Sequence, residues 1–124
     1  MQRVALWLDD NRDPHSNEWR EYARSRANGG TVLWVKSCDA LDQASVDIFT
    51  DPDRNLVAAM FDYDLSTTDT SGENGGYAFG LLKDNVMDFG APPFELSTQT
   101  NSTHGRQLLE RGFGTLREYW RDQE

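Results

Sequence analysis

The sequence predicts an α/β fold, a three-layer sandwich of flavodoxin-like topology with a short parallel sheet in the strand order 2-1-3-4. Three observations predict it. Four short apolar runs alternate along the chain with four longer segments of helical period. The runs are apolar without a break, which is typical of parallel strands covered on both faces. The chain has 124 residues, so we expect a single domain spanning residues 1–124.

The four strands are expected at residues 4–8, 31–35, 56–61 and 93–97. The last of them, Pro93-Phe94-Glu95-Leu96-Ser97, has the weakest pattern. Strands that alternate strictly with helices imply right-handed crossovers, and the chain is too short for a long sheet. We therefore expect the first strand at the centre and the third strand as its neighbour, with no fifth strand.

The helices are indicated by apolar residues at spacings of three and four. The first is expected over residues 17–27, and the second follows Ser37 as a helix cap and stops before Pro52. The third carries the stripe Phe79, Leu82, Val86 and Phe89, and the fourth carries Leu109, Phe113, Leu116 and Trp120. Gly112 and Gly114 each cost a helix about 1 kcal/mol relative to Ala, so the fourth helix either breaks there or continues through both glycines. These apolar and aromatic side chains are expected to form the core, together with Trp7 and Trp34 in the strand runs.

Composition limits the possible partners. The formal net charge of −9 repels phosphate backbones, which argues against broad DNA binding but not against a small phosphorylated molecule or an RNA end held by local cations. No apolar run approaches the ~20 residues that cross a bilayer, and the N-terminus lacks a signal peptide's apolar stretch, so we expect a cytoplasmic protein without membrane contact. Cys38 is the only cysteine, which excludes an internal disulfide.

Acidic residues follow two strands that are expected to be neighbours. Asp9 and Asp10 end the first strand, Asp62 ends the third, and Asp64 lies two residues further on. Adjacent strands are about 4.8 Å apart, so these carboxylates can converge on one small volume. Crowded carboxylates repel one another unless a cation sits among them, and a hard, oxygen-seeking ion such as Mg²⁺ meets that need. The alternative is that these residues only cap helices and make turns.

Other polar residues are candidates for the same end of the sheet. Arg12 can hold a phosphate group by two parallel hydrogen bonds, or it can simply pair with an Asp. Ser97 and Thr98 end the fourth strand, and Asn101 follows them; each can contact a phosphate oxygen or form a turn. His104 is a candidate for acid–base work, with an ordinary loop residue as the alternative. The polar segment 66–76 is either a lid over this site or a plain surface loop.

Five segments, in the right order along the chain, resemble the cyclic-phosphate processing receiver-like domains. The segments are Leu8-Asp9-Asp10-Asn11-Arg12-Asp13-Pro14, Trp34-Val35-Lys36-Ser37, Phe61-Asp62-Tyr63-Asp64-Leu65, Gly75-Gly76-Tyr77, and the stretch from Ser97 to Gly105. The resemblance implies a variant of the response-regulator receiver fold that processes cyclic phosphates on nucleotides or RNA ends. It also implies that Asp9, Asp10 and Asp62 bind magnesium, and that Asp62 holds the position of a phosphoryl acceptor.

The sequence departs from that family at chemically important positions. Tyr63 and Ser97 stand where the family has histidines, and the family's Asn-Pro step is Asn101-Ser102. The fifth strand of ordinary receivers, with its lysine, is missing. Three functions therefore stay open: a magnesium-dependent enzyme acting on cyclic phosphates, with Asp62, Asp64 and His104 as catalytic candidates; a non-catalytic interaction module with a protein partner; and a phosphoacceptor domain without its usual lysine.

Overall fold

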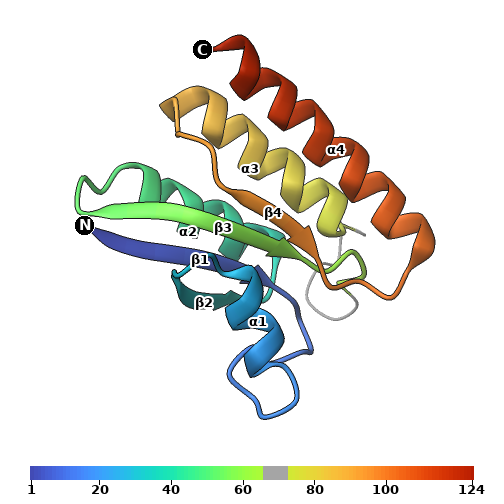
Figure 1. Ribbon diagram of the computed structural model, residues 1–124. Coiled ribbons are helices and arrows are strands. Elements are labelled where there is room, and N and C mark those ends of the chain that lie inside the picture. Colours follow the sequence, from blue (N-terminus) through green and yellow to red (C-terminus); the bar gives the residue numbers. More distant parts are fainter. Residues whose placement is uncertain (66–72) are drawn as a thin grey trace.

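The computed structural model describes residues 1–65 and 73–124. The elements in chain order are β1 (Gln2–Leu8), α1 (Arg20–Arg26), β2 (Thr31–Val35), α2 (Cys38–Phe49), β3 (Arg54–Phe61), α3 (Gly75–Phe89), β4 (Glu95–Thr98) and α4 (Thr103–Asp122). The four strands form one parallel sheet in the order β2-β1-β3-β4, and Figure 1 shows all four pointing the same way. The predicted fold class and strand order are confirmed.

The central strand β1 explains why its sequence is apolar throughout. Val4, Leu6 and Leu8 pack under α2, α3 and α4, whereas Ala5 and Trp7 pack under α1 on the opposite face. Successive side chains of a strand point to opposite faces, so a strand with helices on both sides needs apolar residues at every position.

The face under α1 is covered by small residues and an aromatic group. Ala23 and Ala27 let α1 approach the sheet closely, and both are buried. The Trp7 ring lies 6.2 Å from the rings of both Trp19 and Tyr22, which pack against this layer. We therefore confirm Trp7 as a core residue.

Several element boundaries differ from the prediction. The fourth strand is Glu95–Thr98, two residues later than expected at its start, and α1 begins only at Arg20. Phe89 is 46% exposed, so its assignment to the core was wrong. Ser37 does cap α2, accepting a hydrogen bond from the backbone N–H of Ala40 at 3.1 Å.

Helix α4 does not break at its glycines, because it runs without interruption from Thr103 to Asp122. A Cβ at Gly112 would lie 2.8 Å from the Phe79 ring, so this glycine lets α4 pack closely against α3. Packing of the stripe Leu109, Phe113 and Leu116 outweighs the low helix propensity of glycine.

The sequence analysis offered residues 66–76 as a lid or a surface loop. Of these, residues 66–72 lie outside the described residues.

The sequence also predicts a protein without membrane contact. Among the helices of residues 1–65 and 73–124, none combines the length and apolar character that a membrane crossing requires.

Candidate metal centre

Backbone hydrogen bonds continue the sheet beyond the ends of its strands. The N–H of Asp9 donates to the carbonyl of Val35 (3.1 Å), and the N–H of Asp62 donates to that of Leu8 (2.9 Å). The N–H of Gln99 donates to the carbonyl of Phe61 (3.1 Å). The residues that follow β1, β3 and β4 are therefore held side by side at the carboxyl end of the sheet, where ligands of open α/β sheets bind.

Three acidic side chains meet there, as the sequence predicted. Carboxylate oxygens of Asp9, Asp10 and Asp62 all lie within 4.8 Å of one another. Asp9 is fully buried and Asp62 is 5% exposed, whereas Asp10 is half-buried at the mouth. This is a group of hard oxygen ligands of the kind that holds a divalent cation.

Asp9 is held by the turn that follows it. Its Oδ1 accepts hydrogen bonds from the backbone N–H groups of Asn11 (3.0 Å) and Arg12 (2.8 Å), and its Oδ2 accepts one from Arg12 Nη1 (3.1 Å). Arg12 Nη1 also lies 3.4 Å from Asp62 Oδ1. Arg12 therefore bridges two of the three carboxylates, which confirms the alternative that it pairs with an Asp, whereas its binding of a phosphate group stays a prediction.

Two tryptophans fix the same turn, and the sequence analysis missed this role. The indole N–H of Trp7 donates to the carbonyl of Arg12 at 2.9 Å, and that of Trp34 donates to the carbonyl of Asp9 at 2.6 Å. Both rings were assigned to packing alone. A tryptophan one or two residues before a strand end is the only signal in the sequence, and it is a weak one.

The electrostatics of the cluster follow from crowding and burial. Burial raises the pKa of Asp62 to about 6, and the nearby charges of Asp9 and Asp10 act in the same direction against the opposing effects of Arg12 and the Tyr63 backbone N–H. Burial alone would lower the pKa of Arg12, but its contacts with the two carboxylates outweigh that effect and raise it. The site thus disfavours a further negative charge and favours a cation.

Gln99 is a member of the site that sequence reasoning did not find. Its Nε2 donates to the carbonyl of Leu8 (3.0 Å) and lies 3.4 Å from Asp9 Oδ2. Its Oε1 is buried and has no hydrogen-bond partner among the residues that the structure describes. Turning the amide over would set its oxygen against two other acceptors, so the unpaired acceptor is a property of the site.

The predicted hydroxyl ligands lie elsewhere. Thr98 is buried, and its hydroxyl donates its one proton to the carbonyl of Phe61 at 2.6 Å. Ser97 is half-buried and lines a hollow beside Tyr22 and Arg26, along the edge of β4. Neither is among the residues that the structure brings into the acidic cluster.

The remaining predicted site residues lie at the surface. Asp64 and Asn101 are exposed, and so is His104 in the first turn of α4. The His104 ring lies 6.2 Å from the Tyr63 ring in an edge-to-face arrangement. Tyr63 directly follows Asp62 in the chain, so His104 packs against the neighbour of a cluster residue.

Tyr63 has a structural role. Its hydroxyl accepts a hydrogen bond from Asn74 Nδ2 (3.1 Å), and its carbonyl accepts one from the N–H of Gly75 (2.7 Å). A Cβ at Gly105 would clash with the Tyr63 ring, so glycine is needed there. These contacts tie the segment after β3 to the starts of α3 and α4.

Comparison with known proteins identifies no family for this chain. No protein-family model, no curated protein and no solved structure matches the chain. The geometry of the acidic cluster and the motif resemblance therefore carry the functional proposal.

Proposed function

We propose that this protein binds Mg²⁺ at Asp9, Asp10 and Asp62 and processes cyclic phosphates on nucleotides or RNA ends. The observation that carries the proposal is the meeting of three carboxylates within 4.8 Å, two of them on buried residues. When all are ionised, three carboxylates and the Arg12 guanidinium carry a net charge of −2, which one divalent cation balances.

The unpaired oxygen of Gln99 is compatible with a hydrated cation at the cluster. Leaving a buried acceptor without a donor costs about 1–3 kcal/mol. A water molecule at Gln99 Oε1 would supply that donor, and Mg²⁺ characteristically keeps several of its waters. The three carboxylates and the Gln99 oxygen are thus groups that suit a hydrated Mg²⁺ ion.

The chain supplies groups for the other parts of the reaction. A bound Mg²⁺ would offset the negative charge of the phosphate group and polarise it. The ion-pair contacts of Arg12 use Nη1, so its other N–H groups are left to bind a phosphate oxygen, and stacking over the Trp19 ring at 5.3 Å steadies the guanidinium.

Hydrolysis of a cyclic phosphate needs one proton removed and one delivered. Water attacks phosphorus, one ester bond of the ring opens, and the departing oxygen takes a proton. We assign proton removal from water to Asp62 or Asp64, and proton delivery to His104, an exposed residue whose ring contacts Tyr63. The substrate class comes from the motif resemblance, above all from the segment Leu8 to Pro14.

Turnover of a defined panel tests the proposal. Purified protein with MgCl₂ should open 2′,3′-cyclic nucleotides or RNA ending in a 2′,3′-cyclic phosphate, measured by ³¹P NMR. Asp62→Asn keeps the shape but removes the charge, and should lower the rate at least about 100-fold. Asp88→Asn, an exposed carboxylate at the end of α3, is the charge-matched control and should leave the rate unchanged. Equal rates for both variants would refute the assignment.

A non-catalytic module is the second candidate, and specific observations favour it. Tyr63 and the Thr98 hydroxyl are both used for internal contacts, so two positions near the cluster are structural. In that case, titration calorimetry would detect Mg²⁺ binding that Asp62→Asn abolishes, with no turnover of any cyclic phosphate. Beryllofluoride added with Mg²⁺ distinguishes the third candidate, since shifts of the Asp62 and Tyr63 amide signals would indicate a phosphoacceptor.

A further inference from the structure

The outer edge of β4 has no neighbouring strand within the described residues. Because the N–H of Gln99 bonds to Phe61 on β3, the residues one and three positions earlier present their backbone groups to the other side. Leu96 and Thr98 therefore face outward, and the carbonyl of Thr98 accepts a hydrogen bond from the Tyr22 hydroxyl at 3.3 Å. A strand edge without a neighbour is a template for another strand, and the two outward-facing residues are themselves largely buried.

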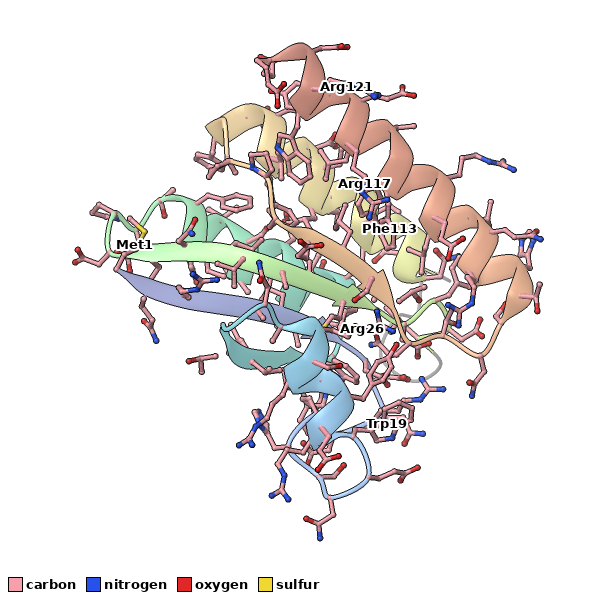
Figure 2. All side chains as sticks on the ribbon, viewed as in Figure 1. Met1, Trp19, Arg26, Phe113, Arg117 and Arg121 are labelled. Carbon is pink, nitrogen blue, oxygen red and sulfur yellow. The ribbon has the colours of Figure 1, made fainter. Side chains whose placement is uncertain are left out.

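A furrow runs along this edge. Two hollows of about 340 and 270 Å³ share Arg26, Leu96 and Ser97, so they form one continuous groove, here called the β4 groove. Figure 2 shows Arg26 on α1 and Arg117 on α4 at opposite sides of β4, with Phe113 beside Arg117. The groove thus has a strand edge as its floor and a helix on each side.

Three arginines line the β4 groove, and each is held by a neutral group. Arg26 lies 5.1 Å over the Tyr22 ring, and Arg117 lies 5.9 Å over the Phe113 ring. Arg106 Nη2 donates to the carbonyl of Thr100 at 2.9 Å.

None of these three arginines forms an ion pair with another residue that the structure describes, although the chain carries a net charge of −9. Two carboxylate residues also line the β4 groove, Glu110 in the wider hollow and Glu95 in the narrower one. The three arginines outnumber them, so the β4 groove has a net positive lining on an acidic protein, and it is complementary to an acidic partner.

We propose that the β4 groove binds an extended acidic segment of a partner protein, which adds to the sheet as a fifth strand. The main chain of the segment pairs with Leu96 and Thr98, and its Asp or Glu side chains reach Arg26, Arg106 and Arg117. A second copy of this chain fits poorly, because a two-fold contact between β4 edges would set the same arginines against each other. This surface is separate from the acidic cluster, so the inference does not depend on the proposed catalysis.

Binding of a defined peptide tests the charge requirement. A fluorescein-labelled octapeptide of alternating Glu and Val should bind in an anisotropy titration, and its Lys/Val counterpart should not. The triple variant Arg26→Gln, Arg106→Gln, Arg117→Gln should weaken binding at least about tenfold. Arg24→Gln, Arg111→Gln, Arg121→Gln changes the net charge equally at exposed positions outside the β4 groove, and should retain binding.

Backbone pairing has its own test. Two N-methylated peptides are compared, one methylated at the odd positions and one at the even positions. In one of them the methyl groups replace the N–H groups that face the β4 edge, and in the other those N–H groups remain. Only one of the two peptides should therefore lose binding. Amide signals of Leu96 and Thr98 should shift and gain protection from hydrogen exchange. Equal binding of both methylated peptides, equal loss in both triple variants, or stronger binding of a labelled oligoribonucleotide would overturn the proposal.

Discussion

Asp62 carries its charge in an environment that disfavours it. Burial and the neighbouring carboxylates raise its pKa from 3.8 to about 6, so the folded protein holds this proton more tightly than the unfolded chain does. Below about pH 4 both states are protonated and the group costs nothing. As the pH rises from about 4 to about 6 the unfolded state ionises first, and stability is lost; above about 6 the full cost remains.

The pH dependence of Asp62→Asn checks this sign. In EDTA, the stability of the variant relative to the wild type should increase by about 1–3 kcal/mol between pH 4 and 7. Urea unfolding at several pH values measures the difference. Asp88→Asn should show no such trend, because Asp88 is exposed at the far end of α3. A difference for Asp62→Asn that does not vary with pH would contradict the raised pKa.

Helix α4 shows how packing between elements overrides local preference. Two of its glycines are two residues apart in sequence but differ in surroundings. A Cβ at Gly112 would lie 2.8 Å from the Phe79 ring of α3, whereas a Cβ at Gly114 would find nothing within 4 Å. The helix crosses both without a break, so Gly112 serves close contact and Gly114 serves none that the structure reveals.

Alanine at each glycine separates these effects. Gly114→Ala should raise the free energy of unfolding by about 0.5–1 kcal/mol, because alanine has the higher helix propensity. Gly112→Ala should lower it by about 1–3 kcal/mol, because the added methyl group pushes α4 away from α3. Urea unfolding of both variants at one pH suffices. Equal stabilisation by both would show that α3 and α4 do not pack this closely.

The whole chain carries a net charge of −9, and part of this negative charge is concentrated in the acidic cluster. Salt screens general repulsion, so NaCl should raise the melting temperature modestly. A specific cation site adds a second effect, because ligand that binds only the folded state stabilises it by mass action.

Magnesium compared with sodium separates the two effects. At an equal ionic strength of about 0.15 M, MgCl₂ should raise the melting temperature more than NaCl does. The double variant Asp10→Asn, Asp62→Asn should respond equally to both salts. Asp84→Asn, Asp88→Asn removes the same charge from the exposed side of α3 and should keep the magnesium preference. A preference retained by the first double variant would place the cation elsewhere.

Periodicity and topology rules were enough to predict the sheet and the position of its acidic end. Unbroken apolar runs such as Val4 to Leu8 indicate strands covered on both faces, and the alternation with helices sets their parallel order. Once β1 and β3 are neighbours, Asp9 and Asp62 must follow adjacent strand ends. This inference needs only the sequence, because repeating backbone geometry fixes where consecutive strands finish.

Side-chain partners were decided by the tertiary structure alone. Arg12 bridges Asp9 and Asp62, Gln99 reaches Asp9 from 90 positions away in the chain, and the Thr98 hydroxyl turns to Phe61. The same holds for the β4 groove, whose arginines come from α1 and α4. Each of these contacts joins segments that are distant in sequence. Their relative positions are set, to within tenths of an ångström, by packing, and no local sequence pattern predicts them. Local sequence patterns were enough to predict the layers and the meeting of the carboxylates. Only the three-dimensional arrangement shows that Arg12 pairs with these carboxylates, and that the arginines of the β4 groove form no ion pair with another described residue.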